Sequence, residues 1–306
     1  MVGKRSIKDH IVDIIIILIM LFVIAAVMYP FLNALAISFN HAEDTALGGI
    51  TLWPRRFAWE SYRSILTNPI IWRAYAITIY RTVVGTVLAL FCTGIIAYGL
   101  SHSNLVGRKA YSFICLVPMY FTGGLIPVFL MIRQMGLFNN LLVYVVPALI
   151  GLFNIILMRT FFQSLPEALE ESARIDGANY LQIFFRIIVP VSTPIMATIA
   201  LFVGVGHWND WFTGVVYITN PDLRPMQNVL LAVVNEARMQ EQLAALTGQA
   251  GGAAAAAAGM MGRGRPANVR SITMATMFVT IFPVLIVYPF LQKYLVKGMM
   301  VGSIKG

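Results

Sequence analysis

The sequence predicts an all-α membrane protein with six transmembrane helices and cytoplasmic N- and C-termini. Of its 306 residues, 58% are hydrophobic and 11% are charged, whereas soluble domains are roughly 25% charged. The mean hydropathy is +0.77. Six apolar runs are each long enough for the ~20 residues that a spanning helix needs. The predicted spans are 11–39, 72–100, 111–131, 141–162, 191–218 and 271–295.

Basic residues near the spans predict the orientation. Lys4, Arg5 and Lys8 precede the first span, which is longer than the roughly 7 to 15 apolar residues of a signal peptide, so we expect a retained helix. Arg108 and Lys109 lie in the short loop after the second span, and the chain ends with further lysines. Between the first two spans, the polar segment 40–69 places Trp53, Trp59 and Tyr62 at the expected outer interface.

The third span contains Pro118, Gly123, Gly124 and Pro127, which predict a bent or broken helix. These spans give the following division of the chain: cytoplasmic tail 1–10, transmembrane domain 11–296, cytoplasmic loop 164–190, extracytoplasmic loop 220–270 with an Ala/Gly-rich insert 248–264, and cytoplasmic tail 297–306. We interpret the insert as a low-complexity linker or as a docking arm for an external partner. The loop that contains it begins with a helix after Pro225.

The polar segment 164–190, called the charged loop below, interrupts the apolar runs. Ser164 and Glu167 have the spacing of a helix-capping box, with Glu170 in the first turns and Gly177 suited to a left-handed end. A helix over 165–176 is therefore expected. A second helix follows, with an apolar stripe that continues to Pro190 and consists of Tyr180, Ile183, Phe184, Ile187 and Ile188.

Motifs for catalysis are missing from the chain. It has no phosphate-binding G-x-x-x-x-G-K-[ST] loop and no H-E-x-x-H, and its four histidines are isolated along the sequence. The two cysteines, Cys92 and Cys115, lie inside apolar runs. We expect no enzymatic activity, no metal and no cofactor on this chain. Although the net charge is +9, its basic residues mostly flank apolar spans, so nucleic acid is not an expected partner.

The charged loop resembles the EAA loop of bacterial ABC importer permease subunits, most closely those for carbohydrates. The segments that carry this resemblance are ESARIDGA at 171–178 and IFFRIIVP at 183–190, together with AYGLS at 97–101, HWNDW at 207–211 and the end of the chain from 287. Ser172 stands where the motif has its first alanine. The resemblance implies the type I importer permease architecture, in a multi-pass protein of the bacterial cytoplasmic (inner) membrane.

The resemblance also implies partners. These are a homologous second permease, two cytoplasmic ATPase subunits that hold ATP and Mg, an extracytoplasmic solute-binding protein, an oligo- or polysaccharide substrate and membrane lipid. The ATPase-coupling residues implied by the motif are Glu167, Ala168, Glu171, Ala173, Asp176, Gly177, Ala178, Phe184 and Pro190. The alternative interpretation of the charged loop is an amphipathic segment on the lipid surface.

A substrate pathway is expected where polar and aromatic residues occur within spans. The candidates are Arg81, Tyr120, Thr122, Trp208, Asn209, Asp210 and Trp211. Aromatic faces stack on sugar rings, but the tryptophans equally suit helix packing or an interface belt. Three interpretations of Arg81 are open: it contacts an acidic sugar, it pairs with an acidic residue of a partner, or its side chain extends outward to the membrane surface.

Two alternative functions remain from the sequence. One is a self-contained secondary transporter or channel, although the acidic residues lie mainly at span edges and in loops rather than at buried ion-coupling positions. The other is an ABC importer permease for a solute that is not a sugar.

Overall fold

The computed structural model describes residues 7–249 and 269–301. This part of the chain is helical and contains no β-strand, only an isolated bridge between Asn40 and Phe57. Most of the Ala/Gly-rich insert 248–264 and the ends of both predicted tails lie outside the described residues. The chain forms two compact units, Met1–Pro69 with Leu230–Ile281 and Ile70–Val229 with Phe282–Gly306.

Unit 1 contains α1 and the polar segment that follows it. Its helices are α1 (Ile7–Ser38), α2 (Ala42–Ala46), α3 (Glu60–Leu66), most of α13 (Met226–Gln249) and the first part of α15 (Val269–Val301). Helix α1 matches the first predicted span, and α13 confirms the helix expected after Pro225. The structure also extends the last predicted span, because α15 continues to Val301.

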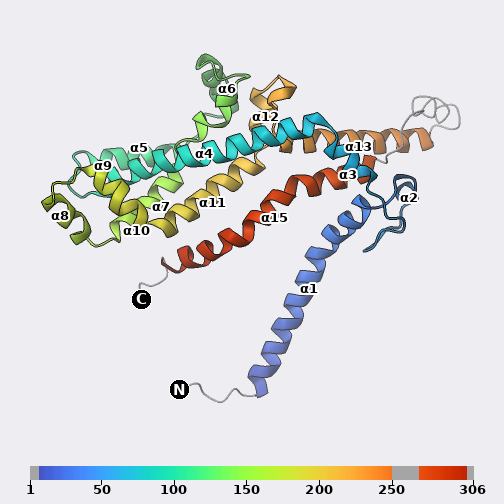
Figure 1. Ribbon diagram of the computed structural model, residues 1–306, viewed down its shortest axis with the longest axis horizontal. Coiled ribbons are helices and arrows are strands. Elements are labelled where there is room, and N and C mark those ends of the chain that lie inside the picture. The colour runs from blue at the N-terminus through green and yellow to red at the C-terminus, as the bar shows by residue number, and fades with distance from the viewer. Residues whose placement is uncertain (1–6, 250–268, 302–306) are drawn as a thin grey trace. The chain divides into compact units, whose positions relative to one another are not determined.

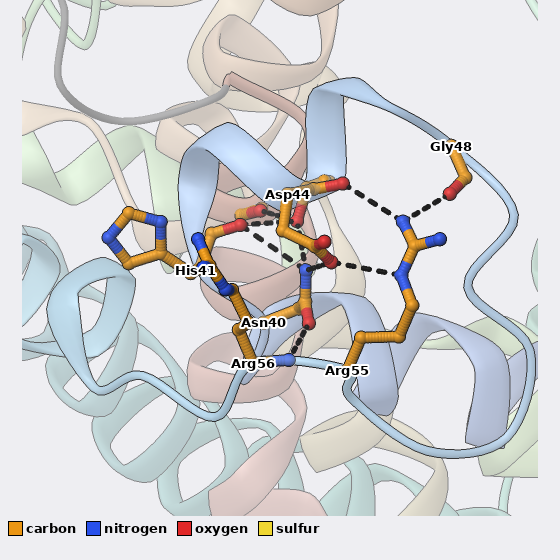
Figure 2. A network of polar contacts seen from close by, with 8 residues as sticks. Asn40, His41, Asp44, Gly48, Arg55 and Arg56 are labelled. Carbon is orange, nitrogen blue, oxygen red and sulfur yellow. Dashed lines mark hydrogen bonds and ion pairs between the residues drawn. The ribbon is translucent and has the colours of Figure 1, made fainter.

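A buried amide organises the segment between α1 and α3, as Figure 2 shows. Asn40 Nδ2 donates to Asp44 Oδ2 at 2.8 Å, and Asn40 Oδ1 accepts from the Arg56 amide at 2.9 Å. Arg55 Nε donates to the same Asp44 oxygen at 3.0 Å, and Arg55 Nη2 donates to the Gly48 carbonyl at 2.6 Å. The hydrogen bond from Asn40, followed by that from Arg55, lowers the pKa of the Asp44 carboxyl. These bonds join α2 to the residues that precede α3.

Aromatic rings cover one side of this loop. Phe39 stacks on Phe57 and on Tyr62, with ring centroids 5.5 and 4.6 Å apart. The Tyr62 hydroxyl lies 2.9 Å from Ser38 Oγ, and burial raises the pKa of this phenol. Trp53 and Trp59 are exposed.

Unit 2 is built around the long helix α4. Its elements are α4 (Pro69–Ser101), α5 (Arg108–Tyr120), α6 (Leu125–Gln134), η1 (Leu141–Tyr144), η2 (Val146–Ala148), α7 (Leu152–Gln163), α8 (Ala168–Ile175), α9 (Tyr180–Ile183), η3 (Phe184–Ile188), α10 (Val189–Val191), α11 (Thr193–Asn209), α12 (Phe212–Tyr217) and η4 (Pro221–Leu223), with the start of α13 and the end of α15. In Figure 1, α8 and α9 lie at one end of α4, and α6 and α12 lie towards its other half.

The apolar helices are long enough to cross a membrane. Three helices of the described part qualify alone, and up to six spans result if each pair of helices joined by a short bent break counts as one. The break predicted in the third span is confirmed, because α5 and α6 meet at 117° around Phe121–Gly124. The fourth predicted span differs from expectation, since 141–148 forms two short 3-10 turns and the α-helix begins only at Leu152. Pro147 lacks an amide donor and Gly151 precedes the helix, which explains the late start.

The core of unit 2 has two clusters of buried side chains. One cluster joins the end of α4 to α7, α8, α9 and α11, and its largest members include Met158, Phe162 and Phe184. The second joins α4 to α6, η1 and the end of α12 through Ile77, Tyr144 and their neighbours. The charged loop is packed into the first cluster, and Arg81 lies against Tyr144 of the second.

Candidate functional site

The first candidate site is the charged loop, whose first helix begins later than the sequence predicts. The expected capping box at Ser164 is wrong, because Ser164 Oγ donates instead to the Phe161 carbonyl at 2.7 Å and so closes the end of α7. Helix α8 starts at Ala168, with Glu167 as its N-cap and without a side-chain cap. A serine hydroxyl can bond the preceding helix as readily as the next one, and the sequence pattern does not distinguish the two.

The end of α8 agrees with the prediction. Gly177 has a φ of +82°, which a residue with a side chain rarely adopts. Its amide donates to the Arg174 carbonyl at 3.0 Å, and the Ala178 amide donates to the Ala173 carbonyl at 2.9 Å. These two bonds form a Schellman motif, so the chain reverses immediately after the helix.

Helix α8 has an inner and an outer side. Ala173 is 7% exposed and packs into the core cluster with the ends of α4 and α7. Ala168, Glu171 and Ile175 follow the i, i+3, i+7 spacing of one helix face, and all three are exposed. Ile175 is 86% exposed. The sequence interpretation overlooked it, although an isoleucine four residues after Glu171, outside the apolar stripe, was a visible signal. The implied contacts Glu167, Asp176 and Pro190 are exposed as well.

The second half of the charged loop is anchored in the core. Asn179 and Gln182 form a true capping box at the start of α9, with 2.9 Å bonds in both directions. Of the predicted apolar stripe, Ile183, Phe184 and Ile188 are buried, and Tyr180 is exposed. The Phe184 ring packs over Gly94 of α4, where an added Cβ would lie 3.1 Å from its Cζ. The loop therefore holds α4 through a close ring-to-backbone contact.

Pro190 does not end this helix. The backbone widens into a π-helical turn over Phe184–Ile188 and continues through α10 to Val191. Segment Tyr180–Val191 then meets α11 at 84° around Ser192. Since a proline near the start of a helical turn needs no amide partner, the break falls after Pro190 and not at it.

The second candidate site is the set of residues predicted to line a substrate pathway. Arg81 of α4 is 1% exposed and forms an ion pair with Asp210 at the end of α11. Its Nη1 also donates to the Asp210 carbonyl at 2.8 Å, and its guanidinium carbon lies 4.5 Å from the centre of the Tyr144 ring. The outward-extending alternative for Arg81 is therefore wrong, and its acidic partner is in its own chain.

This ion pair holds a break between two helices. Asp210 is extended, with a φ of −72° and a ψ of 112°, and it ends α11. Its Oδ1 accepts the Thr213 amide at 3.1 Å in the first turn of α12, while Arg81 satisfies its backbone carbonyl. The Tyr144 hydroxyl donates to the Leu223 carbonyl at 2.9 Å and fixes the ring under the guanidinium. One backbone group on each side of the break, the Asp210 carbonyl and the Thr213 amide, is thereby satisfied.

The neighbouring residues differ in accessibility. His207 is buried, and its ring packs against Gly85 so closely that an added Cβ would overlap it. Trp208 is also buried, whereas Asn209 is exposed and Trp211 is 49% exposed. Tyr120 and Thr122 are exposed in the separate break between α5 and α6. The structure thus brings Arg81 and Asp210 together and leaves Trp211, Asn209, Tyr120 and Thr122 accessible.

Within 7–249 and 269–301, no group of three or more His, Cys, Asp or Glu side chains is placed to hold a metal ion.

Known proteins resemble the chain over nearly its whole length. It is 36% identical to the polygalacturonan/rhamnogalacturonan transport system permease protein YtcP of Bacillus subtilis, over 98% of this chain and 100% of that protein. It is also 36% identical to the LplC protein of Bacillus subtilis, over 92% and 90% of the two chains. The chain belongs to the permease proteins of sugar ABC transporters. No family model matches it.

A solved structure shares the fold of this permease. A bacterial ABC transporter involved in the import of the acidic polysaccharide alginate aligns with a TM-score of 0.83 and 30% identity, over 95% of this chain and 99% of that chain. Permease proteins are the non-catalytic subunits of such transport systems. The resemblance drawn from the charged loop and the chain end is therefore confirmed.

Proposed function

We propose that the chain is one of two homologous permease subunits that form the path for an oligo- or polysaccharide in an ATP-driven importer. In this proposal it crosses the bacterial cytoplasmic membrane six times, with both termini and the charged loop in the cytoplasm. Two ATPase subunits, which hold ATP and Mg, bind the charged loop, and an extracytoplasmic solute-binding protein delivers the sugar. Its relationship to the permeases of polygalacturonan and arabinooligosaccharide systems supports this assignment.

The observation that carries the proposal is the two-sided packing of α8. Its inner residue Ala173 is buried with α4 and α7, whereas Glu171 and Ile175 on its outer face are exposed in the described part of the chain. An exposed isoleucine beside a carboxylate is a suitable contact for a partner protein. Because the inner side is fixed to the spans, force applied to the outer face would move the helices together.

The proposal is tested by replacing residues of α8 in the reconstituted transporter. For Glu171→Ala we expect about tenfold weaker retention of the ATPase subunits, since a hydrogen bond to a charged group contributes about 1.5–3 kcal/mol. Gly177→Ala strains the left-handed turn and should reduce retention and ATP-dependent uptake together. Pull-down with tagged permease and radiolabelled sugar uptake in proteoliposomes measure the two quantities.

Two matched variants serve as controls. Glu43→Ala removes an exposed glutamate of α2, and Gly136→Ala changes a glycine with a φ of +70° in the turn after α6. Both should retain the ATPase subunits as the unchanged chain does. If Glu171→Ala and Gly177→Ala leave both retention and uptake unaltered, the charged loop is not the ATPase contact.

The sugar class requires its own comparison. Uptake by the complete transporter should be tested with oligosaccharides of alginate and of polygalacturonan, with neutral oligosaccharides and with non-sugar osmolytes. We expect uptake of at least one oligosaccharide class. Uptake restricted to the osmolytes would favour the non-sugar alternative, and uptake by the purified permease alone would favour a secondary transporter.

A further inference from the structure

The end of α4 contacts α8 through a histidine that no sequence motif singled out. His102 follows the last residue of the helix, and its ring lies between the two elements. Its Nδ1 is 2.9 Å from the Tyr98 carbonyl oxygen, and its Nε2 is 2.9 Å from Glu170 Oε2. The Tyr98 and Tyr180 rings meet the imidazole edge to face, with centroids 4.7 and 5.6 Å away. The imidazole is therefore held in one orientation by two polar contacts and two aromatic rings.

The hydrogen bonds specify the protonation state of this ring. A backbone carbonyl only accepts, and an ionised carboxylate only accepts, so both ring nitrogens must donate. A neutral ring would require Glu170 to carry the proton instead. However, Glu170 Oε2 also accepts from Arg174 Nη2 at 3.0 Å, so this oxygen is an acceptor and does not donate to the ring. His102 is therefore an imidazolium in this geometry.

The position of His102 favours the same charge. It lies at the C-terminus of a 33-residue helix, where the unpaired carbonyls create a negative potential that stabilises cations. Two other side chains complete this helix end: Arg108 Nε donates to the Leu100 carbonyl at 3.1 Å, and Gln163 Nε2 donates to the Ser101 carbonyl at 3.3 Å. The end of α4 is thus connected by side chains to α5, α7 and α8.

The contact to α8 differs in kind from the apolar packing beside it. Ala173 packs against the core cluster through apolar contacts alone. The bond from His102 to Glu170 has a fixed geometry and adds a charge on each side. We propose that His102 is a positioning residue: its charged ring joins α8 to α4, so that movement of α8 reaches α4 directly. This inference rests on the proposed binding of ATPase subunits to α8.

The joint lies in an open groove. The two side chains are 21% and 20% exposed, and they line a cavity of about 890 Å³ between the end of α4 and the charged loop. The titratable and charged groups that line it with His102 are Tyr98 of α4, Arg108 of α5, Glu167, Glu170, Glu171 and Arg174 of the α8 segment, and Tyr180 of α9.

The experiment uses the complete transporter in proteoliposomes and measures sugar uptake, ATP hydrolysed per sugar, and retention of the ATPase subunits. His102→Ala should lower uptake and raise the ATP used per sugar, each about fivefold to tenfold, which is the effect of one charged contact at a helix end. Retention should not change, because the outer face of α8 is untouched. Ser103→Ala, at the next exposed position, is the control and should behave as the unchanged chain does.

A second variant separates charge from packing. His102→Arg keeps donors for both acceptors and a permanent positive charge, so it should restore uptake and ATP use per sugar to the values of the unchanged chain. Unchanged ATP use per sugar in His102→Ala, or a failure of His102→Arg to restore it, would overturn the inference. Failure of the unchanged chain to retain ATPase subunits would instead contradict the proposed function.

Discussion

Two charged joints, one within helix α4 and one directly after its last residue, differ in their exposure to water. At one joint Arg81 is 1% exposed, stacked on Tyr144 and bonded to both the carboxylate and the carbonyl of Asp210. At the other, His102 and Glu170 are each about one-fifth exposed at the rim of an open groove. A buried pair loses much stability when one partner is removed, whereas water can replace a partner at an exposed pair. We therefore expect the Arg81 joint to fix the fold and the His102 joint to transmit movement.

The largest expected effect comes from breaking the buried joint. Arg81→Ala leaves Asp210 without its guanidinium and exposes the ends of α11 and α12, so the free energy of unfolding should fall by about 3 kcal/mol. Thermal unfolding of the purified complex in nanodiscs measures the change. The double variant Arg81→Ala with Asp210→Ala should lose less than Arg81→Ala alone. A larger loss of unfolding free energy in the double variant would contradict the conclusion that Arg81 and Asp210 stabilise each other.

A smaller effect is expected where α11 packs on α4 near this joint. Gly85→Ala forces the buried His207 ring to move and should destabilise the protein by about 1–3 kcal/mol, the usual cost of overpacking. Gly206→Ala is the matched control, because no atom lies within 4 Å of its added Cβ. In that variant the better helix propensity of alanine should raise stability by roughly 0.5–1 kcal/mol. Equal shifts in the two melting temperatures would argue against close packing at Gly85.

The smallest effect is expected beside the charged loop. An added Cβ at Gly94 would lie 3.1 Å from the Phe184 ring, so the ring must shift by a few tenths of an ångström. Because Phe184 is buried, we expect Gly94→Ala to cost about 1 kcal/mol, at the low end for overpacking. Gly99→Ala, with open space around its Cβ, is the control on the same helix. If Gly94→Ala is as stable as Gly99→Ala, the Phe184 ring moves aside without cost and the contact is not tight.

The sequence predicted well those features that depend on local pattern. Apolar runs located α1, α4 and α15, glycines and prolines located the break between α5 and α6, and Gly177 located the turn after α8. Each of these follows from residues within a few positions of one another. The prediction failed at Ser164, where one hydroxyl suited the end of α7 as well as the start of α8.

Features that join distant residues were not accessible from the sequence. Arg81 and Asp210 were both recognised as unusual within spans, but they are 129 positions apart and no local spacing indicates that they pair. His102 and Glu170 are 68 positions apart, and an isolated histidine carries no signal by itself. Only the packing of α11 and α8 against α4 reveals these contacts.

The π-helical turn at Phe184–Ile188 has a consequence for the length of the charged loop. Such a turn holds one residue more than an α-helical turn, and one residue corresponds to about 100° of rotation around a helix. Deleting a residue here would rotate every later side chain by that angle relative to Ile183 and Phe184. The turn therefore acts as a spacer that sets the angular phase between the core-packed start of the helix and the span that follows.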